Sequence, residues 1–144
     1  MDATRQTNTG IARRWFEALT TGDLAIVEEI VDAAHVRHDP ALADVAAGPT
    51  GAKELVIACR AAFPDIRFTV EDQIVEGDTV VTRWTGRGAG VGTHNPTYRT
   101  AAVTGIEIER IVGHKVVESW ATWDVLGLGT ARAVVPHLAG VPLS

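Results

Sequence analysis

Two glutamates separated by a single residue offer the clearest chemistry in this sequence. Glu107 and Glu109 alternate with Ile106, Ile108 and Ile111, and side chains two positions apart in a strand point to one face of the sheet. On an inward face, the two carboxyls would push each other's pKa apart, which suits an acid and a base. On an outward face they would be solvated charges, and a bulge would exchange the two faces.

Asp124 is another candidate acid or base, at the end of the last predicted strand. It follows Trp120 and Trp123, and burial beside large apolar rings would raise the pKa of its carboxyl. An equally weighted interpretation is a strand-end aspartate that caps a turn or pairs with an arginine.

His38 and Asp39 precede Pro40 in a segment that reads as extended. Histidine readily moves a proton near neutral pH, so His38 and Asp39 are candidate catalytic residues, although a surface loop is the alternative. His94 and Asn95 lie in a glycine-rich stretch, residues 89–96, that could cover the mouth of a pocket. A plain hairpin connection is the favoured interpretation there.

Large aromatic side chains supply candidate ligand contacts. Four tryptophans in 144 residues, Trp15, Trp84, Trp120 and Trp123, are many for this length, and flat rings stack on flat ligands. Phe63, at the end of a predicted helix, joins them as a candidate. Core packing or an oligomer contact is the alternative, and we expect one or two of the tryptophans to line a pocket.

Composition narrows the class of protein. The length of 144 residues, with 46% hydrophobic and 22% charged residues, predicts a single domain spanning residues 1–144. A net charge of −5 with 13 scattered basic residues disfavours a nucleic-acid partner. No run approaches the roughly 20 apolar residues of a membrane helix and no signal peptide is visible, so we expect no membrane contact and a cytoplasmic location.

The sequence contains no motif typical of a metal site or a cofactor site. The five histidines show no spacing typical of a metal site, and Cys59 is the only cysteine, which we interpret as an inert core thiol. No glycine-rich phosphate or dinucleotide motif follows a strand and opens a helix. We therefore expect no metal and no cofactor.

The periodicity changes from helical to alternating halfway along the chain. One helix is predicted between the candidate caps Thr7, Asn8 and Thr9 and the terminating Gly22. Others are predicted over residues 24–31 and from a Thr50 cap to Pro64. The predicted strands span residues 67–76, 79–88, 99–112 and 115–124, with a bulge near Gly105 and a short helix at 130–135. Helices followed by antiparallel strands define an α+β fold.

Six short motifs occur in a fixed order between about residues 9 and 130. They are residues 18–23, 48–51, 63–65, 76–80, 108–112, and 118–120 with Asp124 and 127–128. In this order they resemble the SnoaL-like polyketide cyclase/hydroxylase branch of the nuclear-transport-factor-2-like (NTF2-like) fold. The resemblance implies a half-open cone: about three N-terminal helices on a curved, mainly antiparallel sheet, enclosing an apolar cavity. Its ligand would be a flat polyketide, and no metal or organic cofactor would be needed.

The resemblance also implies where the cyclase acid would lie. The cyclases use an aspartate eleven residues after the arginine of the Arg-Ile-Val segment, and counting from Arg110 reaches Ala121. They also use a histidine three residues before that arginine, where this chain has Glu107, which favours an inward Glu107. Because alanine cannot move a proton, we expect hydroxylation of an aromatic, anthracycline-type polyketide as an antibiotic-tailoring step. Intramolecular aldol cyclisation is the second hypothesis.

Other functions on this scaffold stay open. A non-catalytic ligand-binding or dimerisation module would lack perturbed carboxyls in its cavity, and an isomerase or dehydratase would use Asp39 or a pocket glutamate as its base. The resemblance implies a homodimer through the outer sheet face. Hydroxylation without a cofactor must draw electrons from the substrate, so a separate reductase is an expected partner.

Overall fold

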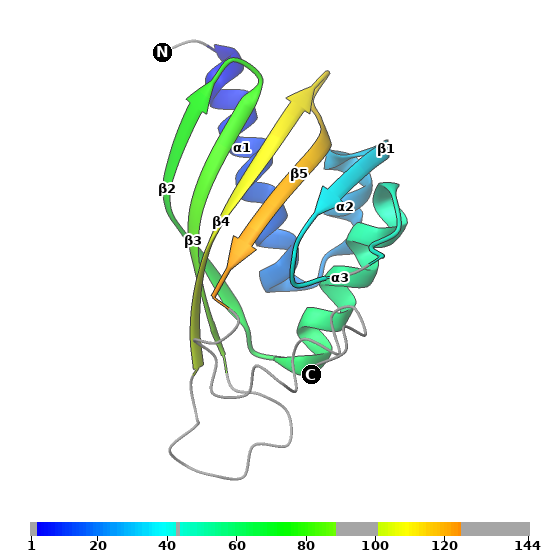
Figure 1. The fold of residues 1–144 in the computed structure, drawn as a ribbon, viewed down its shortest axis with the longest axis vertical. Helices are drawn as coiled ribbons and strands as arrows, with labels where there is room; N and C mark the ends of the chain where they lie inside the picture. The colour runs from blue at the N-terminus through cyan, green and yellow to red at the C-terminus, as the bar shows by residue number, and fades with distance from the viewer. Residues whose placement is uncertain (1–2, 43, 89–100, 125–144) are drawn as a thin grey trace, which may run out of the picture.

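The computed structural model describes residues 3–42, 44–88 and 101–124 (Figure 1). The helices are α1 (Ala3–Thr21), α2 (Leu24–Ile30) and α3 (Gly48–Ala62). The strands are β1 (Val31–His38), β2 (Arg67–Glu76), β3 (Thr79–Gly88), β4 (Ala101–Val112) and β5 (Lys115–Trp123). The predicted loop at 89–96 and helix at 130–135 lie outside the described residues.

Each helix buries an apolar stripe and ends at a residue that suits its terminus. Gly22, with φ of 78°, follows α1, and the Asp23 side chain caps α2 by accepting from the Ala25 N–H. The prediction that Thr7, Asn8 or Thr9 caps the start of α1 is wrong, because the helix already begins at Ala3. Thr9 lies inside the helix, where its hydroxyl donates to the Gln6 carbonyl at 2.9 Å, so it does not act as a cap.

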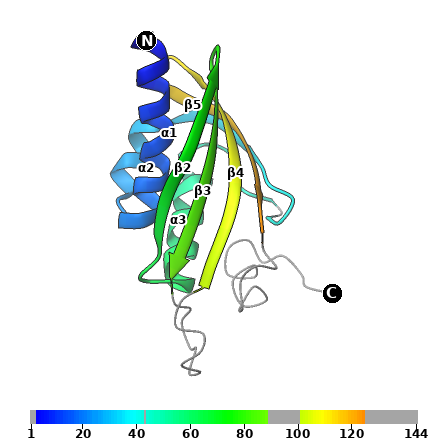
Figure 2. The ribbon, with the colours of Figure 1, turned by 90° about the vertical axis from the view of Figure 1, so that its left-hand side faces the viewer.

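The strands form one sheet in the order β1-β5-β4-β3-β2. β1 runs parallel to β5, and all other neighbours are antiparallel. Figure 2 shows the three helices along one face of this curved sheet. The α+β half-open cone predicted from the sequence is therefore confirmed.

Gly105 does not mark a bulge, which corrects the prediction. Its pairing with Trp84 and Trp123 is regular, and the register of β4 with β5 shifts between Arg110 and Ile111 instead. A Cβ at Gly105 would lie 2.4 Å from Trp84 Cζ2. The glycine therefore makes room for a tryptophan ring.

Candidate functional site

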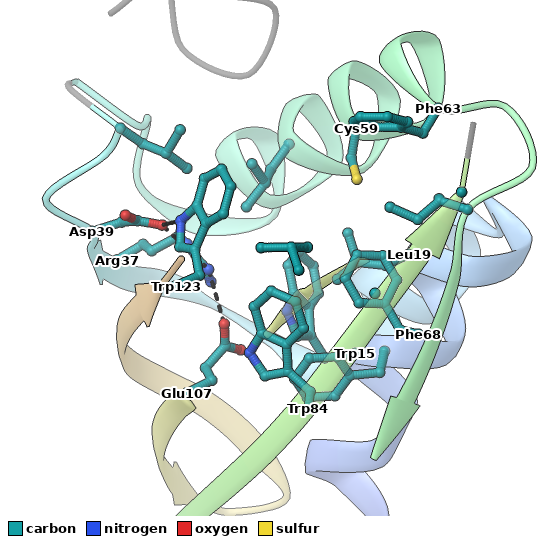
Figure 3. Close-up of a pocket in the computed structure, with 17 residues that line it drawn as sticks. Trp15, Leu19, Arg37, Asp39, Cys59, Phe63, Phe68, Trp84, Glu107 and Trp123 are labelled. Atoms are coloured by element: carbon teal, nitrogen blue, oxygen red, sulfur yellow. Dashed lines mark hydrogen bonds and ion pairs between the residues drawn. The ribbon is translucent and has the colours of Figure 1, made fainter. Parts of the chain in front are cut away.

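An apolar cavity of about 70 Å³ lies between the helices and the concave face of the sheet (Figure 3). Its aromatic wall consists of Trp15, Phe16, Phe63, Phe68, Trp84 and Trp123. The Phe16 and Phe68 rings tilt against Trp84 at centroid distances of 6.0 and 5.3 Å. The volume is small beside the several hundred Å³ of typical ligand pockets, so these walls fit one end of a flat ligand.

Three charged side chains meet at one side of this cavity. Arg37 Nη2 lies 2.8 Å from Glu107 Oε1 and 3.7 Å from Asp39 Oδ2. The Trp123 indole N–H donates to Asp39 Oδ2 at 3.2 Å, and the Arg37 guanidinium lies 5.6 Å from the centroid of the Trp15 ring. Figure 3 shows this cluster opposite Cys59 and Phe63.

Strand parity explains which side chains reach the cavity. Glu107 lies directly opposite Ala121 in the β4–β5 pairing, and both are buried on the concave face. Arg37, the next-to-last residue of β1, points to that face, and Asp39 follows two residues later. The Asp39 carboxylate is fixed in place because its Oδ1 accepts from the Ala41 N–H at 2.9 Å.

Glu107 is a buried carboxyl that forms an ion pair with Arg37. Burial raises the pKa of its carboxyl, and the Arg37 guanidinium opposes that shift. Arg37 occupies Oε1, whereas Oε2 is buried without a hydrogen-bond partner in the described part of the chain. The indole nitrogens of Trp15 and Trp84 are also buried and unpartnered there. The Trp15 indole nevertheless interacts with the Glu107 carboxyl and, like Arg37, opposes the rise in its pKa.

Six of the predicted site residues line the cavity together: Trp15, Asp39, Phe63, Trp84, Glu107 and Trp123. Both glutamates of the Glu107–Glu109 pair are inward, although Glu109 lines a second, deeper cavity. His94 and Asn95 lie outside the described residues.

The structure places three other candidates away from the cavity. Trp120 and His38 lie on the convex face, where their rings stack at a centroid distance of 5.4 Å and His38 Nε2 lies 2.7 Å from Glu118 Oε2. Asp124 is exposed, and its backbone N–H donates to the Thr104 carbonyl. Because Trp123 faces the cavity, the alternation of the strand turns the next side chain away from it.

Sequence reasoning missed Arg37. Arginine is rarely buried without a partner, and nothing in its immediate neighbours predicts burial. The available signal was its spacing of two from Asp39 in an extended segment, which places both side chains on one face. Cys59 also lines the cavity, and burial raises the pKa of its thiol to about 12.

Among the described residues, no group of His, Cys, Asp and Glu side chains is arranged to hold a metal ion. Within the same ranges, no helix has the length and apolar character needed to cross a membrane.

A half-open α+β cone with a buried pocket on its concave face defines the NTF2-like class of protein. The family model "SnoaL-like polyketide cyclase" matches residues 9–132. The chain belongs to that family, which confirms the resemblance seen in its motifs.

Several solved structures share this fold. IdmH from Streptomyces antibioticus, named as a candidate polyketide cyclase, is 27% identical, with a TM-score of 0.75 over 88% of this chain and 99% of IdmH. TsrD from Streptomyces laurentii is 23% identical, with a TM-score of 0.75 over 96% and 99% of the two chains. AclR from Streptomyces galilaeus, named as a candidate hydroxylase, is 22% identical, with a TM-score of 0.68 over 94% and 87%. No curated protein matches the sequence.

Proposed function

We propose that this protein is a cofactor-independent tailoring enzyme for an aromatic polyketide, and that Glu107 is its base. One observation carries the proposal: Glu107 Oε2 is a carboxylate oxygen buried at an aromatic cavity, and no group among the described residues forms a hydrogen bond with it. Membership of the SnoaL-like polyketide cyclase family supports the substrate class. The size of the cavity suits the entry of the reacting ring, with the rest of the substrate outside.

Proton abstraction is the step that this geometry favours. A phenolic or enolisable ring at the cavity would give its proton to Glu107 Oε2, and proton transfer to a positioned group contributes about 10²–10⁴-fold to a rate. The negative charge left on the ring would lie near the Arg37 guanidinium. As Glu107 becomes neutral, Arg37 is freed to stabilise that anion.

We propose hydroxylation as the reaction that follows. A reduced hydroquinone substrate and dioxygen would give a hydroxyquinone and one water. The hydroquinone supplies the two electrons that reduce the second oxygen atom. A separate reductase would then be needed to regenerate hydroquinone from quinone. AclR, a neighbour on the same fold, is named as a candidate hydroxylase.

Aldol cyclisation is the second candidate, and a specific observation favours it. The position that corresponds to the cyclase acid, Ala121, lies directly across from Glu107 on the concave face. The Glu107 carboxyl, one strand away from the position of the cyclase acid, could therefore take a proton from the same substrate carbon. The anion formed on the substrate would then attack an internal carbonyl, with no need for oxygen.

The deciding experiment follows product masses with reduced and oxidised anthraquinone-type substrates, in air and under nitrogen. An oxygen-dependent gain of one oxygen atom supports hydroxylation. A new ring formed equally well under nitrogen supports cyclisation. Ligand binding without conversion would contradict an enzyme and favour a binding module.

Variants then assign the base. Glu107→Gln should lower kcat/KM by about 100-fold or more, whereas Glu76→Gln, at an exposed position of β2, is the matched control. Asp39→Asn tests the other carboxylate of the cavity. If Glu107→Gln retains activity while Asp39→Asn loses it, the assignment to Glu107 is wrong.

We also propose a homodimer formed through the convex face of the sheet. Ile74, Val81, Ile108 and Trp120 are successive cross-strand partners and form an apolar row. Ile74 is 64% exposed and Trp120 38% exposed. Glu118 on this face pairs with both His38 and Arg110, which neutralises part of the charge that a second copy would cover.

Light scattering tests the dimer. The wild-type chain should have twice the monomer mass, and Ile108→Glu should yield a folded monomer. A monomeric wild-type protein would contradict the proposal.

A further inference from the structure

A second cavity lies deeper than the first, behind Arg37 and Trp15, which line both. Its volume of about 10 Å³ is close to the space that one water molecule needs. Besides Arg37, its polar wall consists of His35, Glu109 and Ser119. The remaining wall is apolar, so the cavity is closed to a polyketide but suits a single small polar occupant.

Two polar groups in this wall have unmet hydrogen-bonding capacity. Glu109 Oε1 and Arg37 Nε are buried without a partner in the described ranges. His35 Nε2 and Ser119 Oγ, in contrast, lie 2.8 Å apart and satisfy each other. A buried polar atom without a partner costs roughly 1–3 kcal/mol, and an internal water bridging two or more such groups removes that cost.

The charges around this cavity do not balance if every carboxyl is ionised. Among the described residues, Asp39, Glu107 and Glu109 are buried around one cation, Arg37, whose side chain is only 9% exposed. Arg37 forms ion pairs with Asp39 and Glu107, and within the described ranges no ion pair includes Glu109. An isolated buried charge is strongly disfavoured, so Glu109 is the carboxyl that retains a proton.

We propose that the inner cavity binds one water molecule joining protonated Glu109 to Arg37, and that Glu109 is thereby a positioning residue for Glu107. This inference rests on the proposed role of Glu107 as the base. With Glu109 neutral, Arg37 remains oriented toward Glu107. Ionised Glu109 would compete for the same guanidinium.

The surroundings of Glu109 support a neutral carboxyl. Burial raises the pKa of Glu109 well above its ordinary value, and the charge of Glu107 raises it further, against the opposing effect of Arg37. From β1, His35 also faces the cavity, and its low pKa of about 4 leaves it uncharged. β5 contributes Ser119 and Val116, and the helices contribute Trp15, Ile30 and Ala52, none of which carries a charge.

Carbon-13 NMR of the glutamate carboxyls tests the proton directly, without any substrate. At about pH 7 the wild-type protein should show a protonated glutamate carboxyl that is lost in Glu109→Gln and kept in Glu71→Gln, an exposed control on β2. In Glu107→Gln, the titration midpoint of Glu109 should fall because a neighbouring negative charge is gone. If Glu109→Gln fails to fold, sequential assignment identifies the wild-type signal instead.

An ionised Glu109 at about pH 7 would overturn the proposal, as would a midpoint that does not move in Glu107→Gln. A high-resolution crystal structure tests the water: density in contact with Glu109 and Arg37 is expected, and an empty cavity would refute the bridge. These readouts are independent of turnover. If Glu107 is not the base, only the kinetics would therefore show it. If the water site is absent, only the NMR titration and the crystal structure would show it.

Discussion

Acid should destabilise this protein through His35, and replacing that residue should remove the effect. His35 is 5% exposed, with Nε2 at 2.8 Å from Ser119 Oγ. Burial, reinforced by the positive charge of Arg37, lowers the pKa of His35 from 6.5 to about 4. Between these two values the unfolded chain binds a proton that the folded chain does not, so the free energy of unfolding falls as the pH falls.

The expected magnitude follows from the size of this shift. The difference between 6.5 and about 4, at roughly 1.4 kcal/mol per pKa unit, corresponds to about 3 kcal/mol. The stability is fully present above about pH 6.5. It is lost progressively as the pH falls to about 4, below which this group contributes no further change.

Urea unfolding measured at several pH values between about 7 and 4 tests this prediction. His35→Gln keeps a side chain that can bond to Ser119 but does not titrate. Over this pH range, the free energy of unfolding of the variant should therefore fall by about 3 kcal/mol less than that of the wild type. Contributions from other groups cancel in the difference between the two proteins. His114→Asn, at an exposed turn residue with φ of 64°, controls for the loss of an imidazole. Parallel curves for wild type and His35→Gln would refute the reasoning.

Three further predictions concern the packing and charge of the site: two substitutions, and the reactivity of Cys59 in the unchanged protein. Gly105→Ala places a Cβ against the Trp84 ring and should lower the free energy of unfolding by about 1–3 kcal/mol; an unchanged melting temperature would contradict this. With its pKa near 12, the Cys59 thiol should react with Ellman's reagent at least about 100-fold more slowly in the folded than in the unfolded protein, and equal rates would refute its burial. Arg37→Met leaves buried carboxylates without their cation and should cost about 3–5 kcal/mol. Arg14→Met removes a more exposed ion pair and should cost less than about 1 kcal/mol, so similar losses for the two arginines would be evidence against the buried cluster.

Strands β2 and β3 could be predicted closely because their signals are local. Alternation of side chains and the turn at residues 76–78 place β2 and β3 at the observed bounds. The start of α1 could not be predicted in the same way. Thr9 is a good cap in isolation, but a helix that continues through it uses the hydroxyl for an internal bond.

The faces of the strands could not be predicted from alternation alone. Alternation shows that Glu107 and Glu109 share one face of the sheet. It does not show whether that face is the one that the helices cover. Once Trp123 is known to face the cavity, the outward position of Asp124 follows from parity. The burial of Arg37 is harder to predict, because it depends on its bond to Glu107, which is 70 residues away in sequence.

The proposal that Glu107 is the base rests on what each carboxylate already bonds. Both oxygens of Asp39 are occupied, Oδ1 by the Ala41 N–H and Oδ2 by the Trp123 indole. Glu109 lines the inner cavity, and Asp124 is exposed to solvent. Glu107 alone combines a position at the aromatic cavity, a cation on one oxygen, and a second oxygen without a partner among the described residues. A buried ion pair does little for stability by itself, so this arrangement supports the proposal that Glu107 accepts a proton from the substrate.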